Sequence, residues 1–419
     1  MSGRARLASV LLCGYRPFFL LAGASAPLLM LPWLLLLNGG GLSVWQPPGG
    51  VVLWHVHELL FGFAGAAIAG FALTAVPEFT HTRAAAGRPL LLLVLAWLLA
   101  RLAYPLAALW PAFPGLWPAA LCNLAFWIGL LAQLCPSLWR DPGRPHMSFA
   151  WVIVALALLQ IGFFAAPFGG GDPMAWLRAA TGALMLLIVV ATSRISMSVV
   201  NGRIEEGRPG APAPTAIYLA RPPRRYLAMF CIAACSASEL FLGQTPGTGW
   251  TALAASAAMF NLLNDWHVGR PLFNRWALLL YASYWLVALG YGAMGAAWLG
   301  APFAVSSGRH LLTGGALSLA IFAVMSMVGR IHSGRWLDRR PWLPLCAGAL
   351  LLAALLRAWA GLPGAPGALL FGLAGILWSA AFVLYLVHAW PCLAAPREDG
   401  QTGCTPPRGA MRNEAADCA

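Results

Sequence analysis

Residues 51–77 read VVLWHVHELLFGFAGAAIAGFALTAVP, a stretch without Lys or Arg and with a single acidic side chain. About 20 apolar residues in a helix cross the hydrocarbon core of a bilayer, whereas a membrane β-strand needs only about 10. The length of this stretch therefore predicts a transmembrane helix. His55, His57 and Glu58 lie near its start. Ionisable groups in a membrane span are energetically costly, so these three are candidates for a functional site.

The rest of the chain repeats this apolar pattern. Of its 419 residues, 60% are hydrophobic and only 9% are charged, whereas soluble domains have about 25% charged residues. We therefore expect an all-α polytopic membrane protein in a lipid bilayer, with about twelve spans. The expected spans are roughly 17–37, 51–77, 89–109, 113–135, 149–168, 176–199, 226–243, 249–264, 276–299, 309–329, 343–361 and 367–391.

The basic residues predict the orientation of these spans. All 26 of them are Arg, and a cytoplasmic N-terminus would place 21 on the inner side and only Arg178 and Arg309 outside. Such an excess follows the positive-inside rule, so we expect both termini to be cytoplasmic. Because the charges lie between apolar segments and form no basic face, the net charge of +13 does not indicate a nucleic-acid partner.

One long loop divides the predicted spans into two groups of six. Residues 207–214 read GRPGAPAP and residues 221–225 read RPPRR, a composition typical of a linker. We expect an N-terminal six-helix half at 1–199, a cytoplasmic linker at 200–225 and a C-terminal six-helix half at 226–393. The polar segment 394–419 is expected to be a disordered tail.

The geometry of a helix separates the two histidines of the opening stretch. His55 and Glu58 are three residues apart and share a face, whereas His55 and His57 point about 200° apart. One straight helix therefore cannot direct both imidazoles at a single iron. They could serve two centres, or one could ligate a metal while the other orients it, and a packing stripe with interfacial histidines is the alternative.

The predicted topology places further polar residues near the outer end of this helix. Paired imidazoles suit the iron of a b-type haem, and neutral imidazole also suits copper. Arginines at the rim could pair with haem propionates, and Glu58 could orient a ligand or handle protons. The candidate metal ligands are His55, His57 and His310, and the candidate propionate partners are Arg178 and Arg309.

A second polar set is expected at the inner ends of the same spans. It comprises His81, which follows the second span with Glu78, and His332 and Arg335, which follow the tenth span, together with Arg194 near the end of the sixth. Histidines at both ends of two spans are compatible with two centres stacked across the membrane. Ordinary interfacial polarity is the alternative explanation.

Several sequence blocks, in the same order along nearly the whole chain, carry a family resemblance. The most specific block is Trp54-His55-Val56-His57-Glu58. The others are Gly14-Tyr15-Arg16-Pro17-Phe18-Phe19, residues 70–77 (GFALTAVP), residues 310–315 (HLLTGG), His332-Ser333-Gly334-Arg335, Ala380-Ala381-Phe382 and residues 396–400 (PREDG). Together these blocks resemble the NnrS family of haem- and copper-containing membrane proteins of the nitric-oxide response. After Arg194 the chain reads ISMSVV, which departs from the family's pattern at a position that could shape the inner site.

The resemblance implies a protein of the bacterial cytoplasmic membrane that binds haem b, with copper as a further cofactor, and protects against nitric oxide. An electron donor such as quinol would then be a partner, and whether the protein is an oxidoreductase acting on nitric oxide is left open. Two other functions remain: a proton-coupled transporter that uses the same polar groups, and a sensor or assembly factor that binds haem or copper without catalysis.

Overall fold

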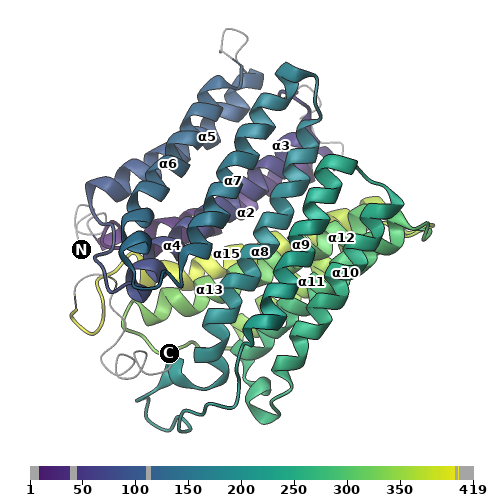
Figure 1. The fold of residues 1–419 in the computed structure, drawn as a ribbon. Helices are drawn as coiled ribbons and strands as arrows, with labels where there is room; N and C mark the ends of the chain where they lie inside the picture. The colour runs from purple at the N-terminus through teal and green to yellow at the C-terminus, as the bar shows by residue number, and fades with distance from the viewer. Residues whose placement is uncertain (1–8, 38–44, 110–114, 402–403, 405–419) are drawn as a thin grey trace.

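A computed structural model describes residues 9–37, 45–109, 115–401 and 404. In this part of the chain there is no β-strand, and eleven helices are long and apolar enough to cross a membrane. Figure 1 shows them as a bundle of long helices that run roughly side by side. The expected all-α polytopic membrane fold is therefore confirmed.

Nine of the eleven spans are formed by one long helix each, and two are composite. The single helices are α2 (Tyr15–Leu37), α5 (Arg88–Leu109), α6 (Trp117–Arg140), α7 (Met147–Ala165), α8 (Pro173–Val200), α9 (Pro222–Leu242), α11 (Arg275–Trp298), α14 (Trp342–Trp359) and α15 (Gly367–Leu393). The expected eighth span corresponds to α10 (Pro246–Leu263), which is less apolar than these eleven because Thr, Ser and Asn interrupt it.

Each composite span contains a π-helical turn between two α-helices. The first span consists of α3 (Val51–His57), the π turn η1 (Glu58–Phe63) and α4 (Ala64–Phe79). The second consists of α12 (Val305–His310), the π turn η6 (Leu311–Leu317) and α13 (Ser318–Ile331). A π turn accommodates one extra residue, so it changes which side chains face a given neighbour.

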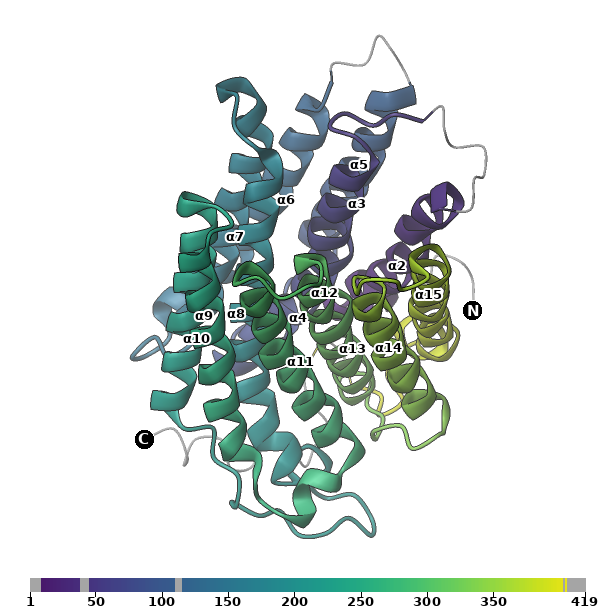
Figure 2. The same ribbon diagram turned by 90° about the vertical axis from the view of Figure 1, so that its right-hand side faces the viewer.

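The two composite spans form the centre of the bundle. In the most apolar window of the first, 94% of the residues are buried, compared with 22% in α9 at the periphery. α13 packs against α2, α4, α11 and α15, and the first and last long helices, α2 and α15, lie against each other (Figure 2). Helices from the two ends of the sequence thus enclose one shared centre.

The segments expected to be a linker and a tail are both attached to helices. Within the expected linker, Asn201 and Tyr218 form two hydrogen bonds of 2.9 Å, which anchor the segment to the end of α8. Of the expected tail, residues 394–401 and Cys404 are described and pack near the end of α13; the remainder lies outside the described residues. The side of the membrane that each terminus faces and the division into two six-helix halves stay predictions.

A close backbone approach joins α12 to α11 and depends on Gly308. A Cβ atom added at Gly308 would lie 2.6 Å from the carbonyl oxygen of Gly290 and 2.7 Å from the backbone nitrogen of Met294. Neither backbone atom can move away as a flexible side chain could. This contact holds the start of α12, and therefore His310, against α11.

We expect Gly308→Ala to lower the free energy of unfolding by about 1–3 kcal/mol, the usual cost of overpacking a core. Gly348→Ala is the matched control, because a Cβ at this helical glycine of α14 would meet nothing within 4 Å. Thermal unfolding of both variants in detergent micelles measures the difference. Equal stability of the two variants would contradict the close approach of α12 and α11.

Candidate functional site

A cavity of about 420 Å³ lies among the N-terminal ends of the two composite spans and α8 and the C-terminal part of α14. Its volume is within the range of about 300–1,000 Å³ that is common for small-molecule sites. Five ionisable side chains line it: His55, Arg178, Arg309, His310 and Arg357. The remaining wall is mainly apolar and includes Trp33, Leu60, Phe63, Leu317 and Trp378.

The imidazole of His310 is oriented by the backbone of its own helix. Its Nδ1 lies 2.8 Å from the carbonyl oxygen of Ser306, which can only accept a hydrogen bond, so Nδ1 carries the proton and Nε2 has a free lone pair. Metal-ligating histidines are commonly held in this way, with one ring nitrogen donating to a carbonyl and the other facing the metal.

His55 presents a second imidazole to the same cavity from the other composite span. Its ring stacks on Trp33 with the ring centroids 4.8 Å apart, which holds the plane of the imidazole. Its Nδ1 is buried and has no hydrogen-bond partner among the described residues. His55 lines the cavity, and no described protein group forms a hydrogen bond with its ring, so its imidazole is suited to a ligand there.

A π turn begins within three residues after the cavity histidine in both composite spans. η1 begins at Glu58, three residues after His55, and η6 begins at Leu311, immediately after His310. π turns occur often at functional sites, where the additional residue redirects a side chain. Gly62 and the pair Gly314 and Gly315 lie inside the turns, but glycines alone do not identify a π turn in a sequence.

His57 points away from the cavity, as the helical spacing predicts. It is fully buried, and its Nδ1 donates to Glu58 Oε1 at 2.9 Å. Its Nε2 accepts a hydrogen bond of 2.9 Å from the side-chain amide of Gln160 in α7. Phe163 stacks on the ring at 4.6 Å. Both nitrogens of His57 are thus occupied by protein groups.

Glu58 contacts both His57 and Arg101 of α5, and with Arg101 it forms a buried ion pair. Arg101 Nε lies 2.8 Å from Glu58 Oε2, and Arg101 Nη2 donates to Asn123 Oδ1 of α6 at 2.7 Å. On the side of His57, the indole N–H of Trp127 in α6 donates to the side-chain oxygen of Gln160. The network connects α3, η1, α5, α6 and α7, and it was not predicted because its members lie far apart in the sequence.

The two arginines predicted at the rim are both present, but each has a carboxylate nearby. Arg309 forms a bidentate ion pair with Glu239 of α9, whose side chain is only 6% exposed. Arg178 lies 3.7 Å from Asp172 and is partly exposed. Arg357 was not among the predicted site residues, yet it lines the cavity from α14.

At the opposite ends of the composite spans, the structure brings together only part of the predicted second set. His332 Nε2 lies 3.3 Å from Glu78, and its Nδ1 donates to the carbonyl oxygen of Cys404 at 2.6 Å. His81 is exposed in the turn after α4. Arg194 donates to the carbonyl oxygen of Pro145, in the loop before α7.

Three of the blocks that carry the family resemblance, those with Tyr15, His332 and Arg397, meet around His332. Arg16 is fully buried and donates to the carbonyl oxygens of Leu393 and Ala395. Arg397 and Tyr15 both donate to the carbonyl oxygen of His332, at 2.9 and 3.0 Å. A disulfide joins Cys13 to Cys404, with the Cα atoms 5.7 Å apart. The start and end of the described chain are therefore held on α13.

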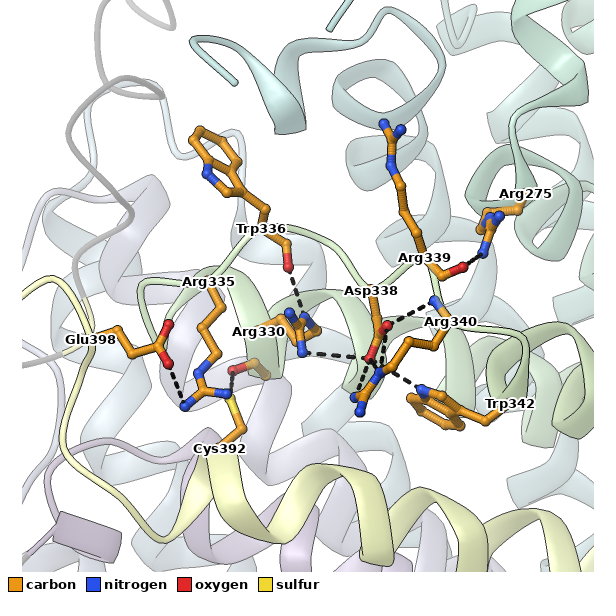
Figure 3. A network of polar contacts seen from close by, with 11 residues as sticks. Arg275, Arg330, Arg335, Trp336, Asp338, Arg339, Arg340, Trp342, Cys392 and Glu398 are labelled. Carbon is orange, nitrogen blue, oxygen red and sulfur yellow. Dashed lines mark hydrogen bonds and ion pairs between the residues drawn. The ribbon is translucent and has the colours of Figure 1, made fainter. Parts of the chain in front are cut away.

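The loop after α13 carries its own polar network (Figure 3). Arg335 pairs with Glu398 at 2.8 Å, so this predicted residue binds the C-terminal segment. Asp338 accepts hydrogen bonds from Arg340 and Trp342 and lies near Arg330. Burial alone would raise the pKa of Asp338, but these partners outweigh it and lower that pKa well below its ordinary value.

These features define a polytopic helical membrane protein with a largely apolar cavity that two histidines face. The family model described as NnrS protein matches residues 9–397. The chain belongs to this family, and membership implies a membrane protein of the nitric-oxide response. A search of curated proteins finds no match.

We expect Arg101→Met to lower the free energy of unfolding by about 3–5 kcal/mol, because it leaves the Glu58 carboxylate buried without its cation. Adding Glu58→Gln removes that stranded charge, so the double variant should be more stable than the sum of the single effects allows. The free energy of unfolding in detergent is measured for Arg101→Met, for Glu58→Gln and for the double variant. Arg144→Met, at an exposed loop arginine, is the control, and strictly additive effects would contradict the ion pair.

Proposed function

We propose that the protein binds haem b in the cavity, where His55 and His310 would hold it, and that it protects cells against nitric oxide at this centre. One observation carries the proposal: two imidazoles from the two central spans face a single apolar cavity, and each has a ring nitrogen that no described protein group occupies. Paired neutral imidazoles are a common ligand set for haem iron.

The cavity wall also suits a flat apolar ligand. Small residues line part of it and leave room for a planar group: Gly314, Ala353, Ala354, Ala374 and Gly375. Aromatic side chains such as Trp33 and Phe63 line other parts, and arginines at the cavity supply cations for acidic substituents. The residues present therefore fit a haem.

Haem iron, when bound, would supply a centre that binds nitric oxide and exchanges single electrons. The chain's own residues prepare the site: Ser306 orients His310, and Trp33 fixes the plane of His55. The apolar wall limits water, and nitric oxide is apolar enough to reach such a site through lipid. We propose that a membrane donor such as quinol supplies the electrons.

The same test of fit fails for copper. The described residues hold no group of three His, Cys, Asp or Glu side chains able to bind a metal ion. Both ring nitrogens of His57 are engaged by Glu58 and Gln160, and those of His332 face Cys404 and Glu78. Copper is therefore not part of the proposed centre, and we assign His57 to orienting the first composite span.

We expect His55→Ala and His310→Ala each to lose most of the bound haem, because each removes one of the two imidazoles that would hold it. His57→Ala should retain haem at reduced stability. His388→Ala is the matched control: this histidine of α15 stacks on Trp342 at 4.5 Å and does not line the cavity. Haem is measured from the reduced-minus-oxidised spectrum of purified protein, and unchanged content in both ligand variants would overturn the assignment.

The same purified protein distinguishes the remaining functions. Consumption of nitric oxide with a reduced donor would identify an oxidoreductase. Haem without turnover would identify a sensor or assembly factor. Protein that contains no haem after expression in haem-replete cells would favour the transporter, in which the buried network of Glu58, Arg101 and His57 would carry protons.

A further inference from the structure

The three arginines that line the cavity differ in how their charge is balanced. Arg309 is neutralised by the bidentate ion pair with Glu239, and Arg178 lies 3.7 Å from Asp172. Arg357 forms no ion pair with a carboxylate of the described chain. Its Nη1 is buried and has no hydrogen-bond partner among the described residues.

The surroundings of Arg357 do not replace an anion. Its guanidinium lies over the ring of Phe371, with Cζ 4.3 Å from the ring centroid, and this cation–π contact stabilises the positive charge in part. The ring carries no net negative charge, so it does not neutralise the guanidinium. A buried guanidinium N–H without an acceptor, in the last turn of a membrane-spanning helix, is destabilising, so the group is suited to a ligand that brings its own negative charge.

The backbone around Arg357 is held in register with His310. Ser307 Oγ donates to the carbonyl oxygen of Ala358 at 2.8 Å, and the amide of Ala304 donates to the carbonyl oxygen of Gly361 at 3.0 Å. These two bonds join the end of α14 to the start of α12, one turn before His310. The cation and the imidazole therefore have a defined separation, as a ligand that contacts both would require.

We propose that Arg357 is the counter-ion for an acidic group of the ligand in this cavity, namely a carboxylate of haem. The proposal rests on the proposed function, since it names the residue that recognises the acidic edge of the same cofactor. A planar guanidinium matches a carboxylate with two parallel hydrogen bonds. Arg357 thus determines that the cavity takes an apolar ligand with a carboxylate rather than a neutral one.

The test compares haem with its dimethyl ester, in which both carboxylates are neutral. Full-length protein produced without haem is titrated in detergent with each compound, and binding is followed by absorbance. Charge-assisted hydrogen bonds of this kind correspond to about 10- to 100-fold in affinity. We expect the wild-type chain to prefer haem by that factor. Arg357→Gln should bind haem as weakly as the wild type binds the ester.

Two further variants make the comparison decisive. Arg357→Lys keeps the charge but not the bidentate geometry and should recover part of the preference for haem over the ester. This variant keeps the comparison possible if Arg357→Gln fails to fold. Arg144→Gln, at an exposed loop position, should retain the wild-type preference. Equal binding of haem and ester by the wild type would overturn the role of Arg357 while leaving the haem site intact. Binding of neither compound would overturn both.

Discussion

The ion pair between Glu58 and Arg101 is the constraint on which the centre of this protein depends. A carboxylate in the most buried span of the bundle is tolerated only with a cation and hydrogen-bond donors around it. Arg101 supplies the cation, and His57 supplies a donor. Although the helical spacing predicted that Glu58 shares a face with His55, its carboxylate joins the network of His57 and Arg101 and does not line the cavity. The network therefore holds the first composite span while His55 lines the cavity.

The two central spans consist of the same sequence of helical elements. Each begins with a short α-helix that carries a cavity histidine and then continues through a π turn into a longer helix packed in the core. Outer helices complete the site by adding Arg178, Arg357 and the Glu239 partner of Arg309. At the other end, buried Arg16 of α2 binds the end of α15, and buried Arg397 of the C-terminal segment binds the carbonyl oxygen of His332 after α13. The cavity therefore lies at one end of the bundle and the anchoring of the C-terminal segment at the other.

Much of the fold followed from composition alone. Long apolar stretches must cross a membrane as helices, because their backbone groups have no water to bind, and these stretches mark most spans to within a few residues. Helical periodicity also separated His55 from His57, since side chains two residues apart on a helix point in different directions. The Asn, Thr and Ser residues of α10 likewise explain why this helix is less apolar than the eleven spans.

The sequence by itself determined the class of protein, the approximate spans and the histidines worth examining, because hydropathy and helical periodicity are local properties. Only the tertiary structure decided which of these residues share a site. It joined His55 to His310 and revealed Arg357, and it left His81 and Arg194 apart from His332. The physical reason is that cavity lining and ion pairing depend on contacts between helices hundreds of residues apart, and on π turns that no local pattern specifies.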